Sequence, residues 1–433
     1  MLRDRDEAEV ERVEDALVDG DVAYQRGTAQ AALRHRDFRI VYLGTFASNI
    51  GTWMQNVILG AYALKLTGSA GFVGLVYFCQ LGPLLFLSTT GGLLADTIDR
   101  RKLLISSQVV QMLLSFGLAA LAVADRPPEA AIAGIVFAIG VVNALGAPSL
   151  SAILPTLVPR EDLSGAVALG SVQMNLSRVI GPAIGAALYA RLDAPPVFAL
   201  NALTYVFAVA GLSWASYPRF TDAVVRERGL RRLLSGVSIV RRDPLLSQLL
   251  LTLFSFSFFS LAFVGLMPVI AHDLFGMDPK GDPYGVLYAC FGLGAALGAT
   301  TVGTVLANRS KTMLLRPGFV AFAAILAWFV MLESAAPAYF VGAVLGYAYF
   351  IVITSMMTVV QEHLRDEERS RVMALWIMGF GGTVPLGVLA AGWVEEHTAA
   401  TIRHVVLAGC VWALVLAGWS GSARLRRKGA RDG

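Results

Sequence analysis

The stretch GGLLADTIDRRKLL, residues 91–104, places a dense group of charges between two long apolar runs. It holds two acidic and three basic side chains between Asp96 and Lys102. The flanking runs, 71–95 and 102–124, are each long enough as a helix to cross about 30 Å of hydrocarbon at about 1.5 Å per residue. This pattern predicts a short polar loop between two membrane-spanning helices.

The overall composition also indicates a membrane protein. Of 433 residues, 56% are hydrophobic and 15% are charged, whereas about 25% of the residues in ordinary soluble domains are charged. A soluble fold of this size could not bury so much apolar surface, so we expect the lipid bilayer as solvent and partner. The basic residues form short clusters between apolar runs, which fits a membrane rim better than a nucleic-acid interface. We expect no nucleic-acid partner.

Motifs of enzyme chemistry are absent from the sequence. The five histidines form no HExxH pattern, and no GxxxxGK[ST] loop for ATP occurs. The three cysteines, Cys79, Cys290 and Cys410, lie inside apolar runs and form no CxxC. We therefore expect no catalytic residues, no metal site and no cofactor.

Twelve apolar runs are predicted to span the membrane. They are 38–64, 71–95, 102–124, 131–157, 163–190 and 196–216, then 246–271, 284–307, 312–332, 337–361, 371–394 and 402–420. The predicted fold class is an all-α membrane protein with twelve transmembrane helices in two six-helix bundles. The expected divisions are an N-terminal tail (1–35), a first bundle (36–216), a linker (217–245), a second bundle (246–420) and a C-terminal tail (421–433).

The charges of alternate loops predict how the chain lies in the membrane. If both termini face the cytoplasm, 28 of the 35 Lys and Arg residues lie on that side and five lie on the opposite side. The remaining two, Arg39 and Arg178, lie within predicted spans. Under the positive-inside rule this bias predicts a multi-pass protein of the cytoplasmic (inner) membrane with both termini in the cytoplasm.

The two halves of the chain resemble each other. A shift of 211 residues superposes three residues on identical types: Gly74, Tyr77 and Cys79 on Gly285, Tyr288 and Cys290. A slightly different shift superposes the polar loop 157–169 on 363–375. Chance similarity among apolar helices is the alternative, but the matching polar loop argues against it. Two six-span units of the same orientation imply a pseudo-twofold axis along the membrane normal.

The loop at 91–104 resembles the signature loop of the major facilitator superfamily, which has a glycine, an acidic residue four positions later and a basic cluster. The matching residues are Gly92, Asp96, Arg100, Arg101 and Lys102. Thr97 and Asp99 depart from the family pattern. The resemblance implies a gate, in which Asp96 lies at the positive N-terminal end of span eleven, near Arg371, and holds the cytoplasmic side closed. A loop that only sets topology is the alternative.

Further stretches resemble one branch of that superfamily, the branch of the enterobactin exporter and related secretion and drug-efflux proteins. They are FASNIGTWMQ (46–55), LTGSAGFVGLV (66–76), NLSRVIGPAIGAAL (175–188) and FALNALTYVF (198–207). The resemblance covers nearly the whole chain beyond residue 35. It implies transport by alternating access between two rocking bundles.

Polar side chains follow one face of two predicted spans. In span one they fall at helical spacing and are flanked by Trp53; they are Thr45, Asn49, Thr52 and Asn56. In span ten the corresponding face carries Tyr347, Thr354 and Thr358. Polar groups within a span usually face a cavity or a partner helix. We expect these residues to bind substrate; hydrogen bonding between helices without a ligand is the alternative.

Arg178 is the one charge deep within a predicted span. A buried arginine in a membrane is a functional candidate, since its planar fork suits carboxylates and phosphates. We expect it to bind substrate, and capping of a neighbouring helix or contact with the membrane rim remain open. Gly181 and Pro182, which follow it, resemble the superfamily's antiporter motif and are equally consistent with a structural kink.

These patterns predict a secondary active transporter that exports a small lipophilic or amphipathic molecule, such as a siderophore, a drug or a metabolite. The direction rests on the resemblance alone. An uptake transporter or lipid flippase of the same fold is one alternative, and a non-transporting membrane scaffold or sensor is another. Protons are a candidate coupling ion, although no Asp or Glu lies in the middle of a predicted span. We expect a monomer.

Overall fold

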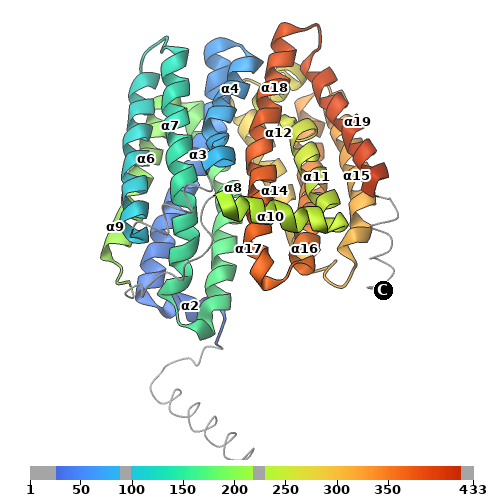
Figure 1. Ribbon diagram of the computed structural model, residues 1–433. Coiled ribbons are helices and arrows are strands. Elements are labelled where there is room, and N and C mark those ends of the chain that lie inside the picture. Colours follow the sequence, from blue (N-terminus) through green and yellow to red (C-terminus); the bar gives the residue numbers. More distant parts are fainter. Residues whose placement is uncertain (1–25, 88–98, 218–229, 421–433) are drawn as a thin grey trace, which may run out of the picture.

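The computed structural model describes residues 26–87, 99–217 and 230–420, and within these ranges every regular element is a helix. Figure 1 shows the helices standing side by side, with those of the first half of the chain grouped beside those of the second half. Gly92 and Asp96 of the predicted gate lie outside the described residues.

The first half of the chain forms one short helix and six long ones. They are α2 (Ala29–Arg34), α3 (Arg36–Thr67), α4 (Ala70–Leu81), α6 (Arg100–Ala122), α7 (Glu129–Ile153), α8 (Leu163–Leu192) and α9 (Ala194–Trp214). The second span extends beyond α4, because helical residues continue to Leu87. Two 3₁₀ turns, η1 (Leu154–Leu157) and η2 (Arg160–Asp162), join α7 to α8.

The second half repeats this plan, but two of its spans are interrupted. Its helices are α10 (Leu230–Arg242), α11 (Pro244–Phe259), α12 (Ala262–Gly265), α13 (Met267–Phe275), α14 (Asp282–Gly303), α15 (Lys311–Met331), α16 (Ala335–His363), α17 (Asp366–Ile377), the π-helix η3 (Met378–Gly382), α18 (Thr383–His397) and α19 (Ile402–Ser420). The seventh span runs through α11, α12 and α13, and Pro268, which lacks a backbone N–H, lies just after its second break.

The eleventh span runs through α17, η3 and α18. The sequence of η3 is MGFGG, and its glycines weaken the regular helix at this point. The span begins at Asp366, five residues before the predicted start at Arg371. Sequence analysis also did not predict α10, which forms a helix within the predicted linker and packs on α17.

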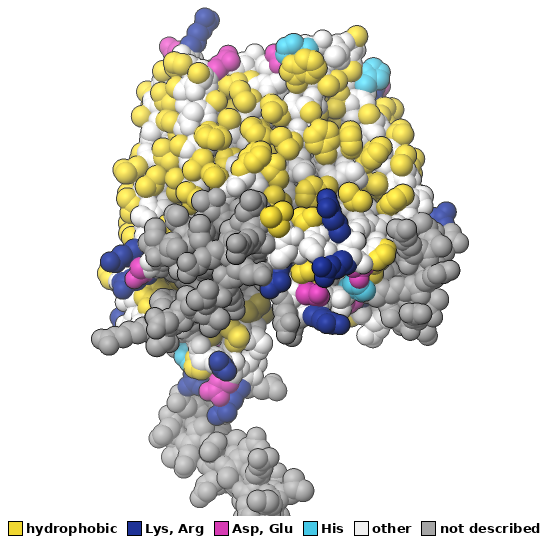
Figure 2. All heavy atoms as spheres, viewed as in Figure 1, with side chains coloured by type: hydrophobic (Ala, Val, Ile, Leu, Met, Phe, Trp, Pro, Cys, Tyr) yellow, Lys and Arg dark blue, Asp and Glu magenta, His cyan; other side chains and the backbone are white. Residues whose placement is uncertain are grey.

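Ten helical segments in the described ranges are long and apolar enough to cross a membrane. The other two spans are α3 and α8, which have 32 and 30 residues but carry more polar side chains. Figure 2 shows hydrophobic side chains over the middle of the molecule, with most charged side chains toward its two ends. The predicted fold, twelve transmembrane helices in two six-helix bundles, is therefore confirmed.

The interiors of the two bundles differ in chemistry. In the first bundle, side-chain hydrogen bonds connect neighbouring helices: Asn201 donates to Gln55 at 2.8 Å, and the Tyr205 hydroxyl donates to Gln111 at 2.8 Å. In the second bundle the interior is aromatic, and the Phe256 ring packs edge-on against Phe319 with centroids 5.0 Å apart. Such aromatic pairs contribute about 0.5–1.5 kcal/mol beyond the area they bury.

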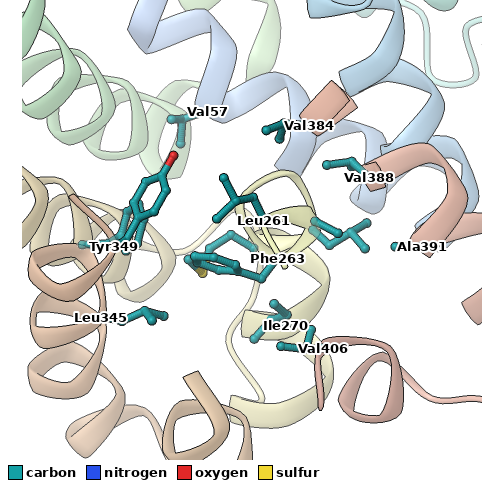
Figure 3. Close-up of a cluster of buried hydrophobic side chains, with 14 of the residues drawn as sticks. Val57, Leu261, Phe263, Ile270, Leu345, Tyr349, Val384, Val388, Ala391 and Val406 are labelled. Atoms are coloured by element: carbon teal, nitrogen blue, oxygen red, sulfur yellow. The ribbon is translucent and has the colours of Figure 1, made fainter. Parts of the chain in front are cut away.

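The two bundles pack on each other through α4 against α18, α8 against α14, and α3 against α13. Glycine allows this close approach, because a Cβ on Gly74 of α4 would lie 2.9 Å from the carbonyl oxygen of Val388 in α18. Apolar side chains of both bundles form one shared core. Figure 3 shows two of them, Val57 of α3 and Val384 of α18, on opposite sides of this core.

Two ends of the molecule must be distinguished. We call the end of the molecule that carries α2 the terminal side (Figure 1). The opposite end is the distal side, where the chain turns from α8 into α9 at Asp193 and from α13 into α14 near Lys280. Gly74 lies near the distal end of α4, so the close packing of α4 on α18 belongs to the distal side.

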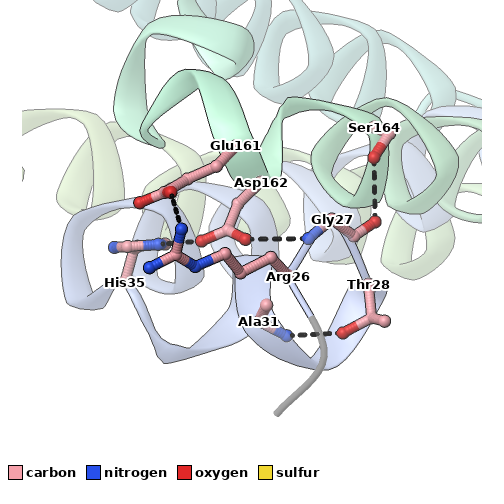
Figure 4. A network of polar contacts seen from close by, with 8 residues as sticks. All are labelled: Arg26, Gly27, Thr28, Ala31, His35, Glu161, Asp162 and Ser164. Carbon is pink, nitrogen blue, oxygen red and sulfur yellow. Dashed lines mark hydrogen bonds and ion pairs between the residues drawn. The ribbon is translucent and has the colours of Figure 1, made fainter. Parts of the chain in front are cut away.

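A histidine–aspartate pair ties helix ends together on the terminal side of each bundle. In the first bundle, His35 precedes α3 and its Nε2 lies 2.8 Å from Asp162, the residue before α8 (Figure 4). In the second bundle, Asp243 precedes α11 and lies 2.6 Å from His363 at the end of α16. The two bundles thus use the same pair of residue types with their positions exchanged.

Candidate functional site

Arg178 lies near the middle of α8, on the helix that packs against α14 of the other bundle. Its guanidinium carbon lies 5.1 Å from the centroid of the Trp53 ring in α3. A cation over an indole face is stabilised by about 0.5–2 kcal/mol, and more strongly where water is excluded. The structure therefore brings together two residues that sequence analysis had assigned to substrate binding, Arg178 and Trp53.

No hydrogen bond or ion pair joins the Arg178 side chain to any residue in the described part of the chain. Its Nε atom is buried and has no acceptor. Buried polar groups in proteins are normally hydrogen-bonded, and a buried charge without a counter-ion is costly. Arg178 as a whole is half-buried, and the described residues leave its hydrogen-bonding capacity unused.

Three tyrosines lie within electrostatic range of the Arg178 guanidinium: Tyr77 of α4, Tyr288 of α14 and Tyr349 of α16. Phe291 connects two of them, since its ring stacks on Tyr349 at 6.0 Å and lies 6.3 Å from Tyr288. We call the set Arg178, Trp53, Tyr77, Tyr288 and Tyr349 the Arg178 cluster. Both bundles contribute to it, so a change in their relative position would change its geometry.

Sequence analysis missed the three tyrosines, although a signal for two of them existed. Tyr77 and Tyr288 are the residues that the internal repeat superposes. A repeated polar aromatic residue within two equivalent spans could have indicated a shared site on the pseudo-twofold axis. Tyr349 had no comparable signal, because only the packing of α16 brings it near Arg178.

Three of the four polar residues in the stripe of α3 form hydrogen bonds to neighbouring helices of the same bundle. Thr45 accepts from Gln173 of α8 at 3.2 Å, and Thr52 lies 3.1 Å from the Tyr205 hydroxyl of α9. Asn56 accepts a hydrogen bond from Gln80 of α4. Only Asn49, which is half-buried, forms no side-chain hydrogen bond within the described ranges.

The polar residues predicted on span ten lie on α16, and all three are half-buried. The Thr358 hydroxyl donates to the Thr354 carbonyl at 2.8 Å, one turn earlier in the same helix. The backbone of Tyr347 packs against Gly298 of α14. The helix contributes Tyr349 to the Arg178 cluster, two residues from the predicted Tyr347.

Among the residues of the predicted cytoplasmic gate, the structure describes side-chain contacts for Arg101. Its guanidinium donates to the carbonyl oxygens of Leu212 at 3.1 Å and Ser213 at 2.5 Å, at the C-terminal end of α9. It also lies 4.9 Å from the centroid of the Tyr217 ring. Arg101 thus caps a helix of its own bundle, where a cation is favoured by the helix dipole. The side chain of Arg100 lies outside what the structure describes.

The distal side carries ion pairs between the bundles that sequence analysis did not predict. Arg191, at the end of α8, lies 3.4 Å from Asp282 at the start of α14. Asp193 pairs with Lys280 across the same gap and lies 3.5 Å from Lys65 of its own bundle. The hydrogen bond from Lys280 lowers the pKa of Asp193, and the charges of Lys280 and Lys65 add to this effect.

The local sequence contained a signal for these pairs. Both loops have a basic residue followed two positions later by an acidic one, in Arg191-Leu192-Asp193 and Lys280-Gly281-Asp282. The pairs are reciprocal, because the base of each loop meets the acid of the other. Exposed ion pairs are each worth only about 0–1 kcal/mol, so these pairs join the bundles without adding much to the cost of separating them.

Comparison with known proteins identifies the class of this chain. The family described as transmembrane secretion effector matches residues 27–432. The staphyloferrin A transporter of Staphylococcus aureus is 25% identical over 360 residues, which cover 80% of this chain and 87% of that protein. The enterobactin exporter EntS of Escherichia coli is 27% identical over 354 residues, covering 79% of this chain and 81% of the exporter.

Solved structures agree on the fold. The POT family transporter PepTSo superposes with a TM-score of 0.71 at 12% identity, over 92% of this chain and 99% of that one. A bacterial homologue of the iron transporter ferroportin, in an inward-facing state, superposes with a TM-score of 0.65 at 13% identity, over 89% of this chain and 99% of that one. The chain belongs to the transmembrane secretion effector family of the major facilitator superfamily and is a membrane transporter of that type.

Proposed function

We propose that the chain exports a small lipophilic or amphipathic molecule, of the siderophore, drug or metabolite kind, from the cytoplasm by alternating access. Two relatives that match most of the chain are named as a staphyloferrin A transporter and an enterobactin exporter. Their names support a siderophore-like substrate, and the second supports export. The transported molecule is then the partner of this protein, together with the lipid around it.

The Arg178 cluster carries this proposal. It contains four aromatic residues and a cation to which no described residue is paired, drawn from both bundles. A membrane scaffold has no need to keep such a group unpaired, since a polar residue without a partner inside a membrane is costly. A transporter needs a site near the midplane that both bundles share.

The ion pairs of the distal side support the mechanism. In alternating access, the site opens to one side of the membrane at a time. Here Arg191 and Lys280 hold the bundles together distally, so substrate would enter from the terminal side. For export, the terminal side must face the cytoplasm, as the distribution of Lys and Arg predicts. Opening then requires that both distal ion pairs break.

The coupling ion and the working unit follow as proposals. Within the described spans, acidic residues lie near helix ends and none lies at the depth of Arg178. Proton coupling would therefore run through groups at the rims or through a charged substrate, rather than through a carboxylate in the middle of a span. We propose that a monomer suffices, since the Arg178 cluster is built from one chain.

The test is a comparison of cells with and without the protein. Cells that lack it should accumulate at least one small organic molecule, detected by untargeted mass spectrometry, and lose it again when the wild-type chain is restored. The Glu129→Gln variant, altered only on the distal surface, serves as the matched control and should restore export fully. Identical intracellular profiles with and without the protein would refute export.

A further inference from the structure

We propose that the transported molecule carries a flat anionic oxygen group, such as a carboxylate, which pairs with Arg178 while an attached ring or apolar body packs against the aromatic residues of the cluster. This inference rests on the proposed transport function and names the chemical class of the substrate. The observations behind it are the missing counter-ion, the free edge of the guanidinium and the tyrosines from both bundles.

The missing counter-ion is the first observation. Arg178 lies in the interior of a 30-residue helix, far from both ends of α8. The described residues provide it with neither an ion pair nor a hydrogen bond. An arginine at this depth requires a partner, and none is present among the described residues, so we infer that a bound molecule supplies the negative charge. A cationic substrate would be repelled from the same position.

The geometry of the guanidinium favours an anion with two oxygen atoms. Trp53 lies beneath the guanidinium, with 5.1 Å between the guanidinium carbon and the ring centroid. The N–H groups of arginine point outward in its own plane, and the Arg178 side chain uses none of them on a described residue. The buried Nε is one such unused donor. Two parallel N–H groups match the two oxygen atoms of a carboxylate.

The tyrosines explain how binding could be linked to the movement of the bundles. Tyr77 belongs to the first bundle, and Tyr288 and Tyr349 belong to the second. A phenolic O–H is a hydrogen-bond donor, so these tyrosines supply donors from both bundles in the surroundings of Arg178. A bound anion would therefore contact both bundles, and its affinity would depend on how they are placed relative to each other.

The experiment compares matched probes on purified full-length protein in nanodiscs of phosphatidylcholine. Salicylate is the anionic aromatic probe, and salicylamide is its uncharged counterpart of similar shape. Binding is followed by tryptophan fluorescence. Salicylate should bind the wild-type protein, and Arg178→Gln should weaken this binding about tenfold or more, because it removes charge-assisted hydrogen bonds. Arg178→Lys keeps the charge without the fork and should bind with intermediate affinity. Salicylamide should bind all three proteins equally and weakly.

Several results would overturn the inference. They are equal salicylate affinity in the wild type and Arg178→Gln, absence of salicylate binding to the wild type, and stronger binding of salicylamide than of salicylate. The lipid source is tested by adding phosphatidylglycerol to the nanodiscs: loss of salicylate binding in that lipid would assign Arg178 to a lipid headgroup. If export persists in cells while salicylate binding does not depend on Arg178, the proposed function stands and only the substrate class is wrong.

Discussion

Tyr77 of α4 and Tyr288 of α14 occupy equivalent positions in the two halves of the chain, and both lie within electrostatic range of Arg178. The two tyrosines that the internal repeat superposes thus share one arginine, Arg178, which belongs to the first half of the chain. The site is built on a symmetric framework but is itself asymmetric, since the shift that superposes loop 157–169 on 363–375 takes Arg178 of α8 to Val384 of α18. This arrangement suits a substrate with one charged group.

The contact between Trp53 and Arg178 should contribute measurably to transport. Trp53→Ala removes the ring beneath the guanidinium, and we expect the apparent affinity for substrate to fall about 2- to 30-fold, as for a cation–π contact of about 0.5–2 kcal/mol. Trp53→Phe keeps an aromatic face and should lose less. Initial transport rates at several substrate concentrations measure this. The control is Trp214→Phe, at an exposed residue of α9; equal affinities in all variants would exclude the contact from the site.

The pair between Arg191 and Asp282 should bias the molecule toward distal closure. Arg191→Glu places two acids together, and we expect the distal-open population to rise by up to about fivefold, since an exposed pair is worth at most about 1 kcal/mol. The exchange Arg191→Asp with Asp282→Arg should restore the original population. Spin labels at Glu129 and Thr398, both on the distal surface, report the distance between bundles. An unchanged distance distribution in both variants would contradict the role of this pair in distal closure.

Acid should open the distal side only at low pH. The Asp193 pKa is lowered by its hydrogen bond to Lys280, so its ion pairs contribute fully above the ordinary aspartate pKa of about 4. That contribution is lost as the pH falls through the lowered pKa of the folded protein. Distal distances should therefore stay constant from about pH 8 to pH 5 and widen only below the usual carboxylate range. Widening near pH 6 would point to a histidine instead.

Asp162 should hold the segment before α3 in place. It accepts a hydrogen bond from the Gly27 backbone at 3.0 Å and lies 2.8 Å from His35, and these contacts lower its pKa (Figure 4). Asp162→Asn should speed hydrogen exchange in α2, because the carboxylate that joins both groups is lost. Glu161→Gln affects only the exposed pair with Arg26 and should leave the exchange of α2 unchanged. The protection of the α2 backbone amides against hydrogen exchange should also be lost as the pH drops through the lowered Asp162 pKa.

The glycine at position 74 should be required for distal closure. A Cβ there would lie 2.9 Å from the Val388 carbonyl oxygen, so Gly74→Val would force α4 away from α18. We expect strongly reduced transport with the distal side held open, visible as a longer distance between the labels at Glu129 and Thr398. Gly134→Ala is the control, since nothing lies within 4 Å of a Cβ at that position. Normal transport by Gly74→Val would show that α4 and α18 need not approach this closely.

Much of the fold could be predicted because lipid imposes a simple rule on sequence. A span must be apolar for about 20 residues, so the twelve runs could be read locally. The breaks in spans seven and eleven required knowledge of how Pro268 and the glycines of η3 are accommodated by their neighbours. α10 had a detectable signal, since LRRLLSGVSIVRR alternates apolar and basic residues at helical spacing.

The candidate site was harder to predict, because a helical face does not reveal its neighbour. The stripe of α3 was identified, but Thr45, Thr52 and Asn56 form hydrogen bonds within their bundle. Arg178 could be recognised from its charge alone. Its aromatic neighbours could not, because Tyr349 is 171 residues away in sequence and only the packing of the two bundles brings it close.

The most direct test is uptake into inverted membrane vesicles that contain the wild-type chain, Arg178→Gln or no added protein. The vesicles are energised and mixed with an extract of small molecules from cells that contain the protein. The compounds taken up by the vesicles are then identified by mass spectrometry. We predict that wild-type vesicles accumulate one or a few anionic compounds that carry a carboxylate or a similar oxygen group, and that Arg178→Gln vesicles do not. Accumulation of cationic compounds, or equal accumulation by the wild type and Arg178→Gln, would contradict the assignment of Arg178 as the substrate's counter-charge.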